Sequence, residues 1–370
     1  MDYLKEFKIK DKNMVFPTFF PDATRGVIRS LASEDLVADS VEGLIVNTYH
    51  LMSQPGTTTV KAIGGIKKFM NWPGWIISDS GGFQVLSLIY RNQNFGTISD
   101  EGVKFIRGSK GGHEKYNLTP EKSVQVQFDL GADIIICLDD VPKHDAKEEE
   151  VEKCVERTIK WGQRSKEEFE RQVKNRKLTD VSRPMIFAVV QGNTYNHLRE
   201  KCAKGLTEID FDGYGFGGWP IDENGNFNNE ILGFTASVLP KKKPKYALGV
   251  GNLQALVACV KMGYNIFDCV LPTRDARHKR LYVFTKDPSK IDFDSKNKFS
   301  DFVFISRGKY VKDPNPISKF CDCFTCKNYT LGYLNHLFTI EDSLSFRLAT
   351  IHNLRTYTRL IEELRKYVNR

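Results

Sequence analysis

The sequence predicts an α/β protein whose core is a (β/α)₈ barrel. Short apolar runs recur along most of the chain, each run stops at a polar residue or a glycine, and helical patterns lie between the runs. Apolar runs without polar alternation are typical of strands that are buried on both faces of a parallel sheet. An open, doubly wound sheet remains the alternative fold, because it is built from the same alternation of strands and helices.

Seven apolar runs are predicted to be strands of this sheet. In chain order they cover residues 44–46, 75–78, 134–138, 186–190, 214–216, 246–248 and 266–267. The residues at which they stop include Asn47, Asp79, Asp139, Gln191, Gly217 and Asp268. In barrels and in doubly wound sheets, ligands bind at the carboxyl ends of the strands. We therefore expect these stops to meet on one face of the protein.

A long helix is predicted between the third and fourth runs. Val151, Val155 and Ile159 recur at helical spacing within the charged stretch 146–177, which is typical of an outer, solvated helix. The character of the sequence changes near residue 300, where a cysteine cluster and a final helical pattern follow. We predict a barrel domain over 1–300 and, over 301–370, a metal-binding subdomain with C-terminal helices packed on the barrel.

The composition indicates an ordinary globular protein. Hydrophobic residues make up 41% and charged residues 27% of the 370 residues, which argues against a disordered chain. No apolar run is long enough to span a membrane, and the N-terminus lacks the apolar segment of a secretory signal, so we expect a cytoplasmic protein. The net charge of +8 suits a polyanionic partner, although a lysine-rich enzyme can reach this charge without one.

Three clustered cysteines indicate a metal site. Cys321, Cys323 and Cys326 supply three thiolates within six residues, and a tetrahedral Zn²⁺ ion takes four nitrogen or sulfur ligands. In a reducing compartment such a cluster indicates a metal rather than a disulfide. Spacing does not choose the fourth ligand, for which His336 and His352 are both candidates. Four protein ligands leave no open position on the ion, so we expect a structural zinc.

Two aspartates at predicted strand ends could carry chemistry. Asp79 opens a Ser-Gly-Gly turn, whose glycines permit close approach of backbone amides to a ligand, although a capping aspartate is the commoner meaning of this pattern. Asp268 lies in an apolar stretch, where a carboxylate is costly to bury unless it is paired or used. Two such carboxylates resemble the pair in retaining glycosidases, in which one attacks the anomeric carbon and the other moves protons.

Other polar residues on the same predicted face could bind a ligand. Asp139 with Gln191 could hydrogen-bond the amide-like edge of a heterocycle, as recognition of a flipped base requires. The stretch 273–280 places several cations directly after Asp268. It is either a solvated charge run or a contact for phosphates.

Taken together, these segments resemble the tRNA-guanine transglycosylases, the enzymes of queuosine biosynthesis. The similarity covers nearly the whole chain. It is carried by the segments 47–51 (Asn-Thr-Tyr-His-Leu), 79–84 (Asp-Ser-Gly-Gly-Phe-Gln), 118–121 (Leu-Thr-Pro-Glu), 190–192 (Val-Gln-Gly), 249–251 (Gly-Val-Gly), 267–274 (Phe-Asp-Cys-Val-Leu-Pro-Thr-Arg), the cysteine cluster and 350–354 (Thr-Ile-His-Asn-Leu). Each motif is weak alone, but all of them in order are highly specific.

The resemblance implies a TIM barrel with a zinc subdomain in which His352 is the fourth metal ligand. Asp268 would be the nucleophile that attacks C1′ of the guanosine at the first anticodon position, and Asp79 would be the general acid/base, while guanine is exchanged for a 7-deazaguanine. The residues implied to bind the base are Ser80, Gly81, Gly82, Phe83, Asp139, Gln191, Gly217, Gly218 and Leu248. Those implied to contact the tRNA anticodon loop are Gly249, Val250, Gly251, Thr273, Arg274 and Arg277.

Some residues depart from the pattern of the family. Leu248 stands where relatives often have methionine, Val141 is closer to the eukaryotic form than to the bacterial one, and Trp219-Pro220 is unusual where relatives have small residues. The incoming base is therefore open: queuine, its aminomethyl precursor or another 7-deazaguanine. Because the sequence ends at Arg370, we expect no extra RNA-binding domain of the archaeal type and no archaeal-type action in the tRNA body.

Two other functions remain as alternatives to a tRNA-modifying homodimer, which is the assembly that the resemblance implies. The first is a paralogue that inserts a deazaguanine into DNA, for which the Trp219-Pro220 segment is the hint in the sequence. The second is a non-catalytic tRNA-binding subunit of a heterodimeric transglycosylase. Such a scaffold has no reason to keep Asp79, Asp139 and Asp268 together.

Overall fold

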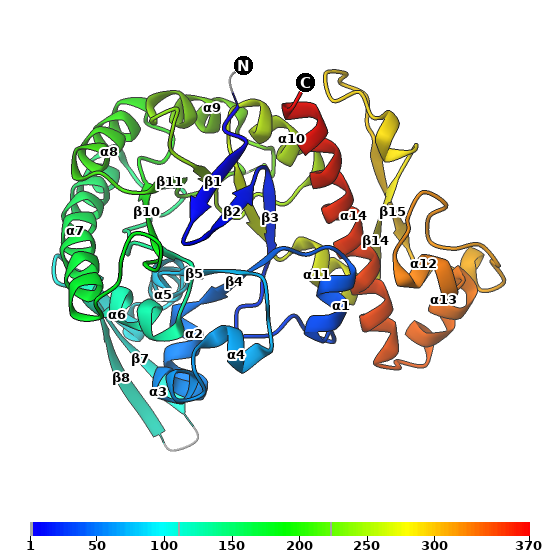
Figure 1. Cartoon of the computed structure of the whole chain (residues 1–370), viewed down its shortest axis with the longest axis horizontal. Coiled ribbons are helices and arrows are strands. Elements are labelled where there is room, and N and C mark those ends of the chain that lie inside the picture. Colours follow the sequence, from blue (N-terminus) through cyan, green and yellow to red (C-terminus); the bar gives the residue numbers. More distant parts are fainter. Residues whose placement is uncertain (1–2, 110–111, 223) are drawn as a thin grey trace.

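The computed structural model describes residues 3–109, 112–222 and 224–370. Eight parallel strands form its core (Figure 1). They are β3 (Thr18–Pro21), β4 (Gly43–Asn47), β5 (Trp75–Asp79), β9 (Ile134–Ile136), β10 (Met185–Val190), β11 (Gly213–Phe216), β12 (Lys245–Ala247) and β13 (Ile266–Cys269). Sheet neighbours follow chain order from β4 to β13, and β13 pairs with β3. A bridge between Asp22 and Ile45 closes the ring. The predicted barrel is confirmed, and the doubly wound alternative is wrong.

The seven predicted apolar runs all lie in or overlap barrel strands, but β3 is absent from the prediction. Its four residues are fully buried, yet Pro17 and Pro21 flank the short run Thr18-Phe19-Phe20. Proline cannot donate to a strand ladder and is depleted in central strands, so the segment resembles a loop in the sequence.

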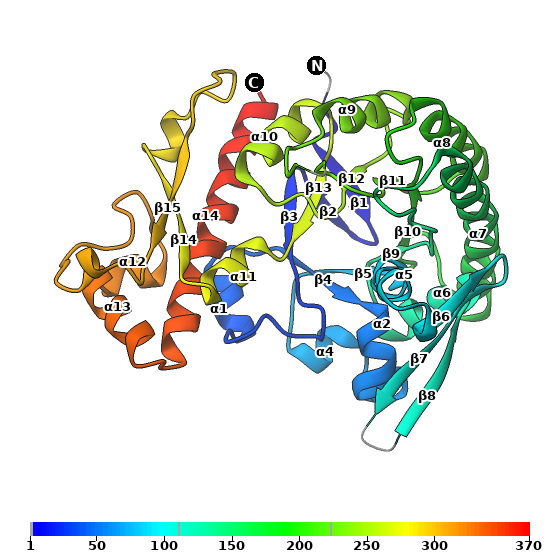
Figure 2. The same cartoon turned by 180° about the vertical axis from the view of Figure 1, so that it is seen from behind.

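Helices surround the barrel (Figures 1 and 2). They are α1 (Ser33–Ala38), α2 (Thr48–Leu51), α3 (Thr57–Ala62), α4 (Ile66–Met70), α5 (Gly82–Arg91), α6 (Pro120–Leu130), α7 (Glu148–Asn175), α8 (Asn196–Ile209), α9 (Asn229–Val238), α10 (Leu253–Lys261) and α11 (Leu271–Arg277). The predicted outer helix is confirmed as α7, which buries Val151 and Val155 and begins with three glutamates. No described helix combines the length and the apolar composition that a membrane span needs.

Two antiparallel sheets that the sequence did not predict decorate the barrel. The hairpin β1 (Glu6–Ile9) and β2 (Lys12–Val15) places Ile9 and Met14 in the apolar cluster of the barrel interior. Its turn residue Lys10 donates to Asp133, which directly precedes β9, at 2.7 Å, so the hairpin covers the amino ends of the strands. The other sheet, β6 (Gly96–Ser99), β7 (Gly102–Ser109) and β8 (Gly112–Leu118), projects from the barrel wall (Figure 2).

The barrel interior is layered, because alternate residues of a strand point to the same side. One apolar cluster fills it and includes Phe20, Ile45, Ile77, Val189, Tyr246 and Ile266. The residues two positions further along the same strands are Asp22, Asn47, Asp79, Gln191, Leu248 and Asp268, and all of them line one cavity. The lower layers are therefore apolar, and the layer at the carboxyl ends is mostly polar.

The rest of the chain packs beside the barrel. β14 (Arg280–Phe284) pairs with β15 (Ser300–Phe304), and α12 (Phe324–Asn328), α13 (Leu331–Thr339) and α14 (Leu344–Val368) follow. The helix α14, which confirms the predicted final helix, lies between the barrel and the β14–β15 pair (Figure 1). Its Tyr357 ring packs 4.8 Å from Phe19 of β3. The division of the chain at residue 300 remains a prediction.

Phe187→Ala is expected to lower the free energy of unfolding by about 3–5 kcal/mol, because this ring fills the barrel interior and its loss leaves a cavity. Val181→Ala, at a position that is 59% exposed, is the control and should change the same free energy by less than about 0.5 kcal/mol. Denaturant unfolding followed by circular dichroism measures both. Equal unfolding midpoints for the two variants would contradict the packing of Phe187.

Candidate active site and metal centre

Four aspartates line one cavity at the carboxyl ends of the barrel strands. The cavity has a volume of 480 Å³, and the aspartates lie at or just beyond the last residues of β3, β5, β9 and β13; they are Asp22, Asp79, Asp139 and Asp268. Like charges in a cavity of low dielectric disfavour each other's ionisation, and burial disfavours it further. Perturbed carboxyl groups gathered in one cleft mark a candidate site for chemistry.

Asp79 ends β5 and is held by its neighbours on β4 and in the following turn. Its Oδ2 accepts a hydrogen bond from Asn47 Nδ2 at 2.7 Å, and the same amide group donates to Gln84 Oε1 at 2.7 Å. The turn requires glycine at position 81, because its φ is +83° and a Cβ there would lie 2.7 Å from the Tyr49 amide nitrogen. Burial, followed by the charge of Asp268, raises the pKa of Asp79 to about 7.

Asp268 is held through a single oxygen. Its Oδ1 accepts hydrogen bonds from the Tyr246 hydroxyl at 2.7 Å and from the Gly249 amide at 2.9 Å. No described residue donates to its Oδ2. Burial raises the pKa of Asp268 to about 6. Asp268 therefore has one anchored oxygen and one oxygen available to react.

Asp139 and Gln191 form a second polar pair, as the sequence suggested. Gln191 Nε2 donates to Asp139 Oδ2 at 2.6 Å. Gln191 Oε1 is buried and accepts no hydrogen bond from the described part of the chain. Gly217 makes room for this amide, since a Cβ at that position would lie 2.2 Å from Gln191 Nε2. Burial raises the pKa of Asp139 to about 7. The pair thus presents acceptors that could receive N–H donors of a ligand.

The cavity walls are apolar and aromatic. Phe83, Val141, Trp219 and Leu248 line it, together with Gly218. The rings of Phe83 and Trp219 meet edge to face with centroids 5.5 Å apart. The indole Nε1 of Trp219 donates to the Pro142 carbonyl at 3.2 Å, which fixes the ring against the cavity.

The remaining predicted site residues fall into two groups. Gly249, Val250, Gly251 and Arg274 line the cavity. Ser80, Gly81, Gly82, Thr273 and Arg277 are not among its lining residues. Ser80 is buried, and its hydroxyl accepts a hydrogen bond from the Gly82 amide at 3.2 Å. The Ser80 hydroxyl therefore stabilises the turn that follows Asp79. Arg277 donates to the Thr273 carbonyl at 2.8 Å, whereas Arg274 is exposed at the rim.

Sequence reasoning missed Asp22 and gave no role to Asn47 or Tyr246. Asp22 follows the barrel strand that was not predicted, so its position at a strand end could not be recognised. Asn47 was expected on this face and Tyr246 lies in a predicted strand, but their bonds to Asp79 and Asp268 depend on which strands are neighbours. The alternation of inward positions within each run is the signal that could have found them.

The clustered cysteines meet His352 of α14. The ligand atoms of Cys321, Cys323, Cys326 and His352 all lie within 4.8 Å of one another. His352 Nε2 donates to the Tyr282 carbonyl at 2.6 Å, which leaves Nδ1 facing Cys326 Sγ at 3.3 Å. A hydrogen bond on the second ring nitrogen is the usual way in which proteins orient a metal-binding histidine. These residues could bind a metal ion, whereas the other candidate, His336, is exposed on α13.

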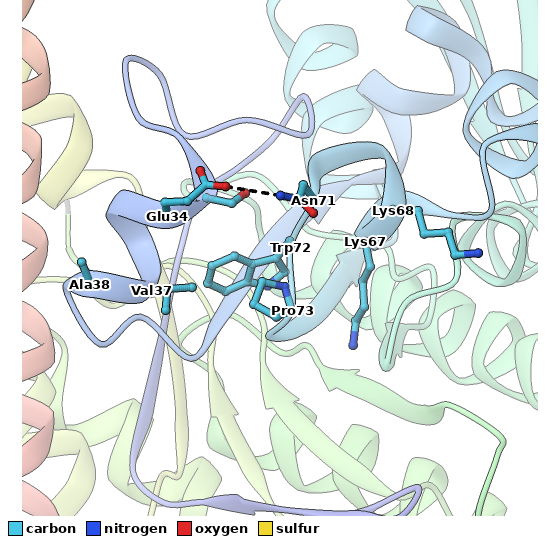
Figure 3. A pocket seen from close by; sticks show the side chains of 9 residues that line it. Glu34, Val37, Ala38, Lys67, Lys68, Asn71, Trp72 and Pro73 are labelled. Atoms are coloured by element: carbon cyan, nitrogen blue, oxygen red, sulfur yellow. Dashed lines mark hydrogen bonds between the residues drawn. The ribbon is translucent and has the colours of Figure 1, made fainter.

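A second cavity, of 570 Å³, lies between α1 and α4 (Figure 3). Trp72 and Pro73 line it and directly precede β5, so it lies toward the amino ends of the strands. Asn71 donates to Glu34 across it at 3.3 Å. None of the four aspartates lines it, so it is separate from the candidate active site.

Comparisons with known proteins agree with this arrangement. A family model described as "Queuine tRNA-ribosyltransferase" matches residues 4–370. The queuine tRNA-ribosyltransferase of Haemophilus ducreyi is 40% identical over 353 residues, which cover 95% of this chain and 85% of that protein. Proteins of the same name from Actinobacillus pleuropneumoniae and Staphylococcus aureus (strain JH9) are 39% and 37% identical with the same coverage of both chains. The chain belongs to the queuine tRNA-ribosyltransferase family.

Proposed function

We propose that this chain is a tRNA-guanine transglycosylase that exchanges guanine at the first position of G-U-N anticodons for a 7-deazaguanine, through a covalent ribosyl-aspartate intermediate. Family membership makes it a transferase, and its relatives are named for action on tRNA. The observation that carries the mechanism is the pair Asp79 and Asp268. Both carboxyl groups lie in one cavity, and their pKa values, about 7 and about 6, allow one to be protonated while the other is ionised.

Asp268 acts as the nucleophile in this proposal. Tyr246 and Gly249 fix Oδ1, so Oδ2 is the oxygen that attacks C1′ of the ribose while the bond from C1′ to the guanine N9 breaks. A carboxylate also stabilises the oxocarbenium character that develops at C1′. The incoming base attacks the same carbon and releases the carboxylate. Two inversions leave the configuration at C1′ unchanged.

Asp79 moves the proton. Its carboxyl group gives a proton to the departing guanine, and the resulting carboxylate takes a proton from N9 of the incoming base. A pKa near the operating pH is the best compromise for a group that must both give and accept a proton. Asn47 holds Asp79 Oδ2 in place throughout.

The base is bound by hydrogen-bond acceptors at its edge and by apolar side chains on its faces. The acceptors of Asp139 and Gln191 match the N–H donors on the pairing edge of guanine, a match that a 7-deazaguanine shares. Phe83 and Leu248 cover the faces of the base, and Gly217 and Gly218 give backbone close access to it. Ser80, Gly81 and Gly82 act from behind the cavity wall, through the turn that follows Asp79. Val141 and Trp219 line the same cavity, so they are the residues to test for the choice between queuine and its precursor.

The RNA partner is the tRNA anticodon loop. Gly249, Val250, Gly251 and Arg274 are proposed to contact it, and the net charge of +8 favours a polyanion. Thr273 is buried, so Thr273 and Arg277 are proposed to support this rim from behind. A homodimer, which the family resemblance implies, and the cytoplasmic location expected from the sequence belong to the same proposal.

The metal is proposed to be a structural zinc ion. Three thiolates and one imidazole are a ligand set that Zn²⁺ prefers, and they fill its tetrahedral positions. The ion would hold the segment 321–326 against α14 and would take no part in base exchange.

Labelled guanine is expected to enter a tRNA transcript with a G-U-N anticodon and to be absent from duplex DNA. In Asp268→Asn the exchange rate should fall by at least about 10³-fold, because the nucleophile is lost. In Asp79→Asn, kcat should fall by about 10²–10⁴-fold through loss of proton transfer.

The matched control is Asp180→Asn, since the side chain of Asp180 is 98% exposed and this variant should exchange guanine at the wild-type rate. Label that enters only DNA would favour the DNA-acting alternative. A wild-type protein that exchanges no base would favour the non-catalytic subunit.

The rate of exchange should depend on pH as a bell-shaped curve. Below about pH 6 the rate falls because Asp268 becomes protonated and loses its nucleophilic form, and above about pH 7 it falls because Asp79 loses the proton that it must donate. The two limbs belong to an interacting pair. The measurement is kcat/KM for tRNA against pH, because this ratio reports the groups of the free enzyme, to which these pKa values belong. A rate that does not change between pH 6 and pH 9 would rule out Asp79 as the acid.

His352→Ala should lose bound metal, and His336→Ala should keep it. Purified wild-type protein is expected to hold about one equivalent of zinc per chain by elemental analysis. The two variants remove the same chemical group, but only His352 contacts the cysteines. Wild-type protein without metal, or equal metal contents in the two variants, would refute the proposed site.

A further inference from the structure

The carboxylate of Asp22 has no part in the chemistry described so far. It lies two residues beyond Phe20, whose ring is buried in the barrel interior, so its side chain belongs to the inward-facing layer at the carboxyl end of β3. In the pairing of β3 with β13, Phe20 lies opposite Asp268. Asp22 is therefore a diagonal neighbour of the proposed nucleophile, and both line the same cavity with Asp79.

The two oxygens of Asp22 differ in their contacts. Oδ1 accepts hydrogen bonds from the Thr24 amide, at 3.2 Å, and from the Thr24 hydroxyl. No described residue donates to Oδ2. The side chain therefore has one oxygen committed to its own turn and one that is available to a ligand in the cavity.

The charges around Asp22 suit a nucleotide. Arg29 and Arg277 are close enough to favour its ionised form, although burial has the larger effect and raises its pKa. The negative charge of Asp22 in turn raises the pKa of both Asp79 and Asp268. Arginines next to a carboxylate can hold the phosphates that flank a ribose while the carboxylate receives a hydroxyl group.

The ribose of a nucleotide within RNA offers one hydroxyl that could donate a hydrogen bond to the Asp22 carboxylate. In a nucleotide within an RNA chain, the 3′ and 5′ oxygens are esterified, so the 2′-hydroxyl is the one free hydroxyl of the ribose. It is attached to C2′, next to the C1′ that Asp268 would attack. Carboxylates are used elsewhere to receive ribose hydroxyls, and the 2′-hydroxyl is the group by which proteins distinguish RNA from DNA.

We propose that Asp22 accepts a hydrogen bond from the ribose 2′-hydroxyl of the target nucleotide and thereby selects RNA over DNA at that position. This inference rests on the proposed function, because it takes the nucleotide attacked by Asp268 as the one that Asp22 contacts. It makes Asp22 a specificity-determining residue. Because Asp22 also raises the pKa of Asp79 and Asp268, the readout must be the discrimination between the two sugars and not the rate alone.

The contact is tested by a double-change cycle, in which one change is made in the protein and the other in the substrate. Guanine exchange is measured as kcat/KM for the wild type and for Asp22→Val, each with a G-U-N anticodon hairpin that carries either guanosine or 2′-deoxyguanosine at the target position. The ratio of the two hairpins gives the discrimination, and comparing this ratio between proteins cancels the intrinsic difference in reactivity of the two nucleosides. Asp22→Val is expected to reduce the discrimination by about 10-fold to 100-fold, the effect of a hydrogen bond to a charged group.

Two further variants separate the contact from a structural role. Thr24→Val removes the hydroxyl that donates a hydrogen bond to Asp22 Oδ1 and does not change Oδ2. This variant should therefore keep the wild-type discrimination even if its exchange rates fall. Asp22→Asn keeps the shape of the side chain and serves if the valine variant does not fold. It should reduce the discrimination by about 3-fold to 10-fold, because a neutral acceptor is weaker than a charged one.

The outcomes are distinct. If the wild type exchanges guanine and the Asp22 variants keep its full discrimination, the contact is wrong while the proposed function stands. If Thr24→Val loses as much discrimination as Asp22→Val, Asp22 acts through its turn and the inference fails. If the wild type exchanges no guanine with the ribonucleotide hairpin, the proposed function itself has failed.

Discussion

The site depends on one constraint, which is that several carboxyl groups are held together where water is scarce. The alternation of side chains in the barrel strands puts apolar layers beneath them, and a few fixed donors hold them in place. Those donors are Asn47 for Asp79, Tyr246 and Gly249 for Asp268, Gln191 for Asp139, and Thr24 for Asp22. Burial and mutual repulsion bring the pKa values of three of them to between about 6 and about 7. A set of acids in this range can divide the roles of nucleophile, proton carrier and base receptor.

The candidate metal site takes no part in the proposed base exchange, but α14 connects it to the active site. His352, Asn353 and Tyr357 are neighbours on α14. Asn353 donates to the carbonyl of Pro272, just after Asp268, at 3.0 Å, and Tyr357 donates to the carbonyl of Gly251 at 2.6 Å. A metal ion bound at His352 would therefore fix a helix that also supports the loops at the rim of the cavity. Loss of the ion would loosen the site without removing any reacting group.

Much of this arrangement could be predicted from the sequence, because buried parallel strands leave continuous apolar runs and their ends mark the ligand face. The long helix α7 was equally visible from its spacing. β3 was not predicted because of its flanking prolines, and Asp22 was therefore not recognised as a residue at a strand end. Spacing treats His336 and His352 alike, so within the sequence only the family resemblance chose His352, and the path of α14 brings this residue to the cysteines. The positions of Thr273 and Arg277 behind the rim also depend on how α11 turns, which a run of charges does not reveal.

The central claim is that the carboxyl group of Asp268 forms an ester with ribose during base exchange. The direct measurement is to quench the enzyme with tRNA during turnover, digest RNA and protein, and locate the nucleoside-linked peptide by mass spectrometry. The account predicts a ribose adduct on the peptide that contains Asp268, with the modification on that side chain. An adduct on Asp79 or on any other residue, or turnover without any adduct, would contradict it.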